Sequence, residues 1–194
     1  MIFTRSTPRH YADYHAYRPF LLNDFEHLCA YCLRHEAHMG GAANSVIDHR
    51  CPVTVCPDRE TDYTNLYLAC SECNTLKGDA WPSPNAQVRG YQFLDPCQED
   101  HDAHWQILPT GEIIALTPVG SYTIDKCRLD REELVYHRRK LHQIRRKAMQ
   151  IVTLLGDPRI TAEERQAYGE RLAEYDDFLH PPVFAKAKRS KTVY

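Results

Sequence analysis

The sequence has no long hydrophobic run and little net charge of either sign. It contains 24 Lys and Arg residues against 26 Asp and Glu residues, which gives a formal net charge of −2 and a pI near 6.6. No apolar run approaches the roughly 18 residues of a transmembrane helix, and the mean hydropathy is −0.56. These absences argue against a membrane-spanning chain and against a uniformly polycationic one.

Two further features are absent. The first ten residues, MIFTRSTPRH, contain no hydrophobic segment of a secretory signal, and no stretch of the chain repeats another. A content of 43% hydrophobic and 26% charged residues excludes a largely disordered chain and a collagen-like one. We therefore expect a folded, cytoplasmic protein, long enough for one domain with an appendage.

Charge is concentrated in blocks although the total is small. Residues 128–149 carry eight Lys and Arg against three Asp and Glu, whereas residues 157–178 carry three against seven. The last eleven residues, 184–194, carry four basic side chains and no acidic one. Such blocks indicate a polyanionic or acidic partner, although solvated helix faces give the same pattern.

Two basic triplets in the first block are spaced seven residues apart, so they recur on nearly the same face of a helix. Such a face is able to follow a phosphate backbone without reading its sequence, or to dock an acidic partner or the acidic block that follows. The six candidate nucleic-acid contacts are Arg138, Arg139, Lys140, Arg145, Arg146 and Lys147.

Four of the eight cysteines form two Cys-x-x-Cys pairs, Cys29 with Cys32 and Cys70 with Cys73. Each pair can place two thiolates on one ion, and two pairs complete a tetrahedral zinc site. Disulfides would also use an even number of cysteines, but the chain is not short and shows no secretion signal. We expect a structural zinc ion held by these four residues, with 37 residues inserted between the pairs.

Other metal ligands are weaker candidates. His35 and His38 follow the first pair closely enough to compete as zinc ligands. Cys51 and Cys56 could begin a second metal site, but no further pair of ligands accompanies them, so buried or free thiols are expected. Cys97 and Cys127 are expected to be packing residues.

The periodicity of the sequence predicts a mixed α+β fold. We expect a short helix within residues 1–28, strands at 45–47 and 65–69, and a helix capped by Ser71 and stopped by Gly78. Beyond a linker-like stretch at 82–90, residues 91–125 read as loops with strands near 104–108 and 112–116. Helices follow from Asp130 to about Gly156 and from the capping box of Thr161 and Glu164, with Leu172, Tyr175 and Leu179 facing inward. We predict two domains, 1–90 and 91–194.

Between and after the cysteine pairs stands an ordered set of polar residues: Asp48-His49, Asn65, Asn74 and Lys77. Together with Cys29-Ala-Tyr-Cys32, Ile47-Asp48-His49 and the segment from Asn65 to Gly78, this order resembles the HNH endonucleases and their ββα-metal core. The resemblance covers residues 29–78. It implies a zinc-stabilised nuclease domain that hydrolyses DNA with a divalent ion, leaving 5′-phosphate and 3′-hydroxyl ends.

The chemistry fits the residue types. His49 can accept a proton from water near neutral pH, and Asp48 is a hard oxygen ligand for Mg²⁺ or Mn²⁺. The resemblance implies that Asn74 is the second metal ligand and that Asn65 orients the histidine, while Lys77 could face a phosphate. Asp48 and Asn65 are also ordinary turn residues, Asn74 could cap its helix, and Lys77 could be structural.

Adjacent residues of a strand point to opposite faces, so Asp48 and His49 share one site only if the strand ends or bends there. The Arg50-Cys51-Pro52 sequence favours an end at this point, because the residue before proline is restricted and strand pairing must stop.

Short flanking motifs narrow the resemblance. Five short segments outside residues 29–78 resemble the flanks of PtuB-type HNH nucleases of Septu anti-phage systems. They are Tyr11-Ala-Asp-Tyr14 with Phe25, Tyr91-Gln-Phe-Leu-Asp-Pro96, Gly111-Glu-Ile, Thr123-Ile and Leu129-Asp-Arg-Glu-Glu-Leu134. That resemblance implies an ATPase protein as partner. Two other functions stay open: an RNA nuclease with the same site, and a non-catalytic, zinc-stabilised nucleic-acid-binding or adaptor module.

Overall fold

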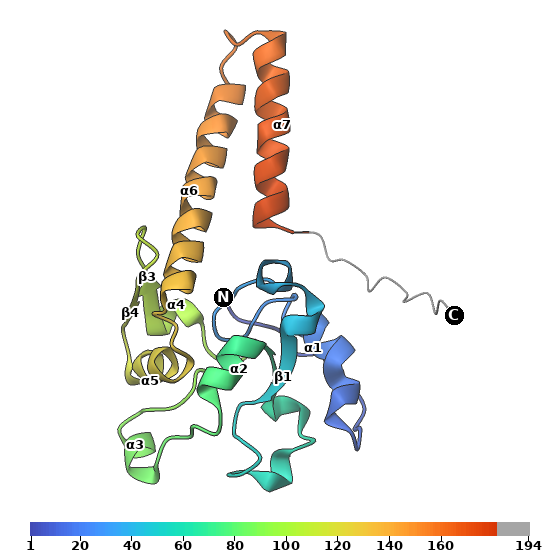
Figure 1. Ribbon diagram of the computed structural model, residues 1–194, viewed down its shortest axis with the longest axis vertical. Coiled ribbons are helices and arrows are strands. Elements are labelled where there is room, and N and C mark those ends of the chain that lie inside the picture. The colour runs from blue at the N-terminus through green and yellow to red at the C-terminus, as the bar shows by residue number, and fades with distance from the viewer. Residues whose placement is uncertain (182–194) are drawn as a thin grey trace, which may run out of the picture. The chain divides into compact units, whose positions relative to one another are not determined.

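A computed structural model of the chain describes residues 1–181 and contains the mixture of helices and short strands that the sequence predicts (Figure 1). By its internal contacts the chain divides into a unit of residues Met1–Gln143 and a second unit that begins at Ile144. Within the described residues, no helix combines the length and the apolarity that crossing a bilayer requires.

Two antiparallel strands and the helix that follows them form the centre of the first unit. Strand β1 (Ser45–His49) pairs with β2 (Leu66–Cys70), in a register that sets Ser45 opposite Cys70 and His49 opposite Leu66. Every residue of β2 is buried, because other elements cover both faces of this strand. Helix α2 (Ser71–Lys77) follows at once and ends at Gly78, as predicted. Its N-cap is Cys70 rather than Ser71, since the Cys70 sulfur accepts a hydrogen bond from the Cys73 backbone N–H.

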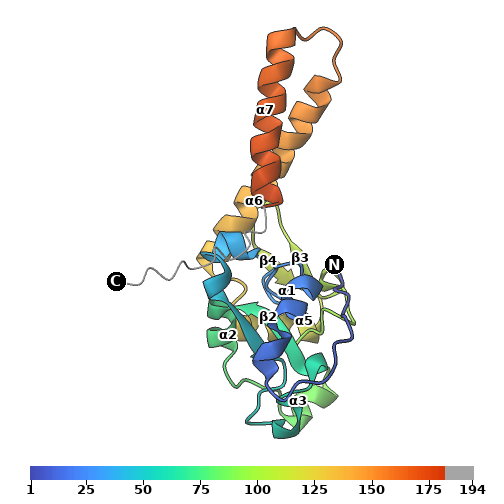
Figure 2. The same ribbon diagram turned by 90° about the vertical axis from the view of Figure 1, so that its right-hand side faces the viewer.

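The N-terminal segment supplies a shorter helix than its periodicity suggests. A 3₁₀ turn (η1, Tyr14–Tyr17) leads into α1 (Arg18–Asp24), which lies against β2 (Figure 2). The chain leaves the helix there because Glu26 and His27 adopt positive φ angles of 50° and 59°. Further 3₁₀ turns are η2 (Glu36–Met39), η3 (Ala42–Asn44), η4 (Pro57–Arg59) and η5 (Tyr63–Asn65).

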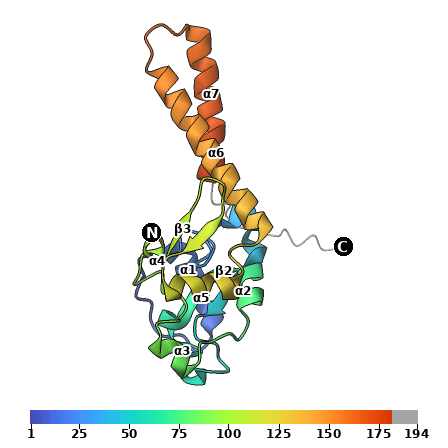
Figure 3. The ribbon, with the colours of Figure 1, turned by 90° about the vertical axis from the view of Figure 1, so that its left-hand side faces the viewer.

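The segment after residue 90 packs onto the same core. It contains α4 (His101–His104), the antiparallel pair β3 (Trp105–Ile107) and β4 (Ile113–Ala115), and α5 (Pro118–Cys127) (Figure 3). The two strands were predicted, but α5 was expected to be loop, and α3 (Pro84–Val88) lies where we expected a linker. The buried side chains that join this segment to β2 and α1 are Phe93, Leu94, Trp105, Val119, Cys127, Leu129 and Leu134. The contacts therefore place the division of the chain at 143/144, whereas we had expected it at 90/91.

The two long helices lie where they were predicted, although the first begins at Glu132 and not at Asp130. Helix α6 covers Glu132–Leu155 and α7 covers Ala162–Leu179, and the capping box of Thr161 and Glu164 is formed. Helix α7 has no buried residue. The side chains that we expected to face inward, Leu172, Tyr175 and Leu179, are half-buried.

The turn between β3 and β4 depends on a glycine. Gly111 has a φ of 91°, and a Cβ placed there would lie 2.0 Å from the Val135 carbonyl oxygen of α6. We expect Gly111→Ala to destabilise the first unit by about 3 kcal/mol or more, because the hairpin would have to move away from α6. Urea unfolding followed by the fluorescence of Trp81 and Trp105 measures this change.

Gly90→Ala is the matched control. Gly90 also has a positive φ, of 84°, but its Cβ would make only ordinary contacts, at 3.8 Å from Pro118. Its expected cost is about 1 kcal/mol, from the backbone alone. Equal losses for the two variants would contradict the close approach at Gly111.

Candidate active site and metal centre

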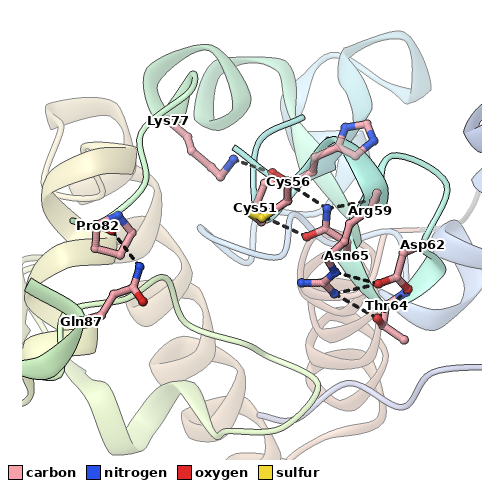
Figure 4. Close-up of a disulfide and its surroundings, with 10 residues drawn as sticks. Cys51, Cys56, Arg59, Asp62, Thr64, Asn65, Lys77, Pro82 and Gln87 are labelled. Atoms are coloured by element: carbon pink, nitrogen blue, oxygen red, sulfur yellow. Dashed lines mark hydrogen bonds and ion pairs between the residues drawn. A yellow bond between two sulfur atoms is a disulfide. The ribbon is translucent and has the colours of Figure 1, made fainter. Parts of the chain in front are cut away.

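The segment that connects β1 to β2 is tied together by one buried side chain. Asn65 is 1% exposed; its Oδ1 accepts a hydrogen bond from the Cys51 N–H (2.8 Å), and its Nδ2 donates to the carbonyls of Cys51 (3.0 Å) and Arg59 (3.3 Å) (Figure 4). The amide thus uses both of its ends within the loop. Asn65 therefore holds the two sides of the loop at a fixed separation, beside the point where β1 ends.

A disulfide closes the same loop. Cys51 and Cys56, which we expected to be buried or free thiols, are bonded to each other with their Cα atoms 6.0 Å apart (Figure 4). The Pro52 carbonyl accepts hydrogen bonds from the N–H groups of Val55 and Cys56, so the chain turns back and brings the two sulfurs together. A spacing of five residues does not reveal such a turn, which is why the prediction was wrong.

The imidazole of His49 is held by the far side of this loop. Its Nε2 lies 2.8 Å from the Glu60 carbonyl oxygen, and because a carbonyl only accepts, Nε2 is the protonated nitrogen of the neutral ring. The Tyr14 ring meets the imidazole edge-on with centroids 4.8 Å apart. The ring is therefore oriented on two sides, with Nδ1 left as the acceptor.

Asp48 lies in a buried polar group. It is 4% exposed; the Tyr31 hydroxyl donates to its Oδ2, and the Lys77 ammonium donates to its Oδ1 at 3.0 Å. Burial raises the pKa of the Asp48 carboxyl, while the positive charge of Lys77 opposes this rise. A carboxylate has about four lone-pair sites, so these two contacts leave acceptor capacity on Asp48.

Lys77 does not face solvent as a phosphate contact would. It is 2% exposed, donates a second hydrogen bond to the His49 carbonyl (2.7 Å), and lies over the Phe93 ring at 5.3 Å from its centroid. The structure therefore corrects the expected role: the ammonium joins the Asp48 carboxylate to the His49 backbone.

One cavity brings the predicted residues together. A hollow of about 290 Å³ is lined by Asp48, His49, Asn74 and Lys77, with the loop residues 52–54 on one side. Because β1 ends at His49, its last two side chains share this cavity although they alternate along the strand. Asn65 does not line the cavity; it fixes the loop beside the cavity through its hydrogen bonds to Cys51 and Arg59.

Two cavity-lining residues were missed by the sequence analysis. Tyr14 comes from the N-terminal segment, and only the fold shows that it reaches His49. Asp79 is exposed at the rim of the cavity, directly after Gly78. Its position next to the motif is the sequence signal that could have identified it.

The four cysteines of the two pairs form one cluster. Their sulfurs all lie within 4.8 Å of one another, and Cys29, Cys70 and Cys73 are buried. The first pair lies in a tight turn, in which the Leu33 N–H donates to the Cys29 carbonyl and Leu33 has a φ of 58°. The second pair lies at the junction of β2 and α2. Four thiols in this space fit tetrahedral zinc.

The histidines considered as competing ligands lie outside this cluster. Among the described residues, the cysteines are the only group of three or more acidic, histidine or cysteine side chains arranged to hold a metal ion. The Nδ1 of His35 accepts a hydrogen bond from the Ala37 N–H. Burial raises the pKa of the Cys29 thiol, whereas hydrogen bonds from the other three cysteines lower that of Cys70.

The six basic residues predicted to contact nucleic acid differ in exposure. Arg138 is 8% exposed, and its guanidinium donates to the Gly111 carbonyl at 3.4 Å, so it is not available to a phosphate. The remaining five are exposed: Arg139, Lys140, Arg145, Arg146 and Lys147.

Comparison with known proteins agrees with the geometry. Residues 29–80 match the HNH endonuclease family, a range that includes the cysteine cluster and the cavity residues of β1 and α2. No curated protein matches the chain. The match supports a nuclease domain and a nucleic-acid substrate, and it leaves the resemblance of the flanks to PtuB-type nucleases unconfirmed.

The buried pair of Asp48 and Lys77 yields a stability prediction. Lys77→Met removes the ammonium and leaves a buried carboxylate without its cation, which we expect to cost about 3–5 kcal/mol. Adding Asp48→Asn should recover much of this loss, because the uncompensated charge is gone. Urea unfolding of the zinc-loaded protein, again followed by tryptophan fluorescence, tests both.

Arg59→Met is the control for that experiment. Arg59 pairs with Asp62 at 2.8 Å, but both side chains are about a third exposed, so about 1 kcal/mol or less should be lost. A loss for Lys77→Met as small as that of the control would show that the buried pair does not stabilise the site.

Proposed function

We propose that this protein is a metal-dependent HNH-type endonuclease that hydrolyses the phosphodiester bonds of DNA. The observation that carries the proposal is the shared cavity of Asp48, His49 and Asn74, in which the His49 ring is fixed by the Glu60 carbonyl. A general base and two oxygen ligands are the groups that metal-assisted phosphodiester hydrolysis needs.

His49 is the general base of the proposed reaction. With its Nε2–H donated to Glu60, the lone pair of Nδ1 is available to take a proton from an attacking water. Asn65 and the disulfide hold the loop that carries Glu60, so they act as positioning groups for the imidazole. The edge-on contact with Tyr14 limits rotation of the ring.

Asp48 and Asn74 would hold the divalent ion, Mg²⁺ or Mn²⁺. Both residues line the cavity, one as a carboxylate and one as an amide, which is a donor set suited to a hard cation. The ion would stabilise the charge that develops on the leaving oxygen. Lys77 fixes the orientation of the Asp48 carboxylate toward this site. Products with 5′-phosphate and 3′-hydroxyl ends are expected.

The wider role is proposed from the flanking motifs alone. Their resemblance to PtuB-type nucleases supports a function in anti-phage defence, beside an ATPase that controls cleavage. Cleavage of RNA by the same site, and binding without cleavage, are the alternatives that a substrate assay separates.

Plasmid cleavage tests the proposed reaction. We expect the purified chain to cut supercoiled DNA with Mg²⁺ or Mn²⁺, and His49→Ala to lower the rate at least ~100-fold, because it removes the general base. His10→Ala, at an exposed position outside the cavity, is the control and should keep the wild-type rate. The assay follows nicked and linear products over time, with EDTA as the metal-free arm.

The outcomes distinguish the candidate functions. A His49→Ala protein that cuts as fast as wild type would overturn the assignment of the base. Cleavage of an RNA substrate but not DNA would change the substrate class. A folded, zinc-loaded wild-type protein that binds DNA without cutting, also after addition of the candidate ATPase, would support the adaptor.

The exposed cations of α6 give a second prediction. Replacing Arg145, Arg146 and Lys147 together by Gln should weaken duplex binding equally across sequences and reduce the slope of log K against log salt by up to about 3. Fluorescence anisotropy at several salt concentrations measures the slope. Arg171→Gln, which removes a cation paired with Glu174 on the acidic helix, is the control and should leave the slope unchanged. An unchanged slope in the triple variant would exclude these residues as phosphate contacts.

A further inference from the structure

Arg131, directly before α6, and Arg138, within α6, are turned inward rather than toward solvent. Only 8% of the Arg131 side chain is accessible, and Arg138 is 8% exposed. The Arg131 carbonyl accepts the hydrogen bonds of the Leu134 and Val135 N–H groups in the first turn of α6, so a spacing of seven residues leaves both arginines on nearly the same side of the helix. Neither position was a metal-site candidate from the sequence, and Arg138 was expected to contact nucleic acid.

Arg131 makes direct contact with the cysteine cluster. One terminal nitrogen of its guanidinium donates to the Cys73 sulfur at 3.4 Å and to Glu72 at 3.2 Å. The other donates to the Cys127 carbonyl at 2.9 Å and the Arg128 carbonyl at 3.1 Å, and Nε forms an ion pair with the Glu133 carboxylate. The side chain therefore bridges the sulfur cluster and the end of α5.

Arg138 is a buried cation without a carboxylate partner. Its side chain forms no ion pair within the part of the chain that the structure describes, the only hydrogen bond of that side chain there is the 3.4 Å contact with Gly111, and its Nε is buried without a partner. Burial lowers the pKa of the Arg138 guanidinium, and the negative charges that oppose this are those of Cys32, Cys73 and, beyond ion-pair distance, Asp130. A buried charge is costly unless an opposite charge lies near it.

The charges of a zinc-loaded cluster supply that counterion. A zinc ion with four thiolates has a net charge of two minus, which is itself expensive to bury. The Arg131 guanidinium brings positive charge against the cluster and is shared between Cys73 and the carboxylates of Glu72 and Glu133, and Arg138 adds a second cation that has no ion-pair partner of its own among the described residues. The salt link of Glu72 with Arg34 lies at a more exposed edge, where solvent screens it.

We propose that Arg131 and Arg138 form the outer shell of the zinc site, Arg131 through a hydrogen bond to the Cys73 thiolate and Arg138 through its buried charge. They raise the affinity of the cluster for zinc, and the loaded cluster in turn fixes the first turns of α6 to the β2–α2 junction. This role depends on the zinc site and is independent of the proposed nuclease activity.

The test measures zinc affinity rather than cleavage. Zinc-loaded Arg131→Met, Arg138→Met and the double variant are titrated with a chromophoric chelator, and the Co²⁺-substituted forms are compared by their thiolate charge-transfer band. Each single change should weaken zinc binding about 10–100-fold, the range known for outer-shell partners. The loss should persist at about 1 M NaCl, because buried charges are screened less than exposed ones.

Two further variants separate charge from packing. Arg131→Lys keeps the charge but loses the bridge to Cys127, so its zinc affinity should lie between those of wild type and Arg131→Met. Arg139→Met removes a neighbouring, exposed cation of the same helix and should leave the affinity unchanged within about twofold.

Three results would overturn the proposal. They are wild-type zinc affinity in the folded double variant, an equal loss in Arg139→Met, and a wild-type protein that binds no zinc. If Arg131→Met does not fold, Arg138→Met decides the question, because that change removes a charge and only one long hydrogen bond.

Discussion

The cluster of four cysteine sulfurs is the constraint on which the first unit depends. It joins a tight turn near residue 30 to the junction of β2 and α2, with 37 residues between the two cysteine pairs. A two-stranded sheet followed by a seven-residue helix has too little apolar surface to be stable alone. Binding of a metal ion here would therefore contribute directly to folding, and it would hold the end of the sheet at which Cys70 pairs with Ser45, opposite to the end that carries Asp48 and His49.

Near this cluster, two sets of buried charged side chains are paired with groups that stabilise their charge. Lys77 lies between the Asp48 carboxylate and the Phe93 ring, and the guanidinium of Arg131 lies against Cys73. Each set joins the motif-bearing core to another segment, so the polar contacts select one arrangement of the chain where apolar packing alone would accept several. The charges near the cavity and those near the sulfurs thus have the same structural effect, although only the first set serves the proposed reaction.

Features encoded by neighbouring residues could be predicted from the sequence, and features encoded by distant contacts could not. The cysteine pairs, the strand ending at His49 and the Thr161 capping box are local signals, and all three are present. Helix α5 was missed because Gly120 and Thr123 are weak helix formers. Gly120 leaves room for the His104 carbonyl, and the Thr123 hydroxyl accepts a hydrogen bond from the Leu94 N–H. Both are tertiary contacts, which the local sequence does not reveal.

The same distinction explains why a family match to residues 29–80 describes less than the unit that folds. Phe93 covers Lys77 and accepts a hydrogen bond from Arg50 through its carbonyl, while Arg131 reaches Cys73 from the position directly before α6. These contacts come from residues outside the match, yet they support side chains within it. Since a buried ammonium or thiolate needs its partners in order to stay buried, the core and the segment 91–143 stabilise each other. The unit that folds is therefore residues 1–143, and the cavity and the cysteine cluster are supported from both parts.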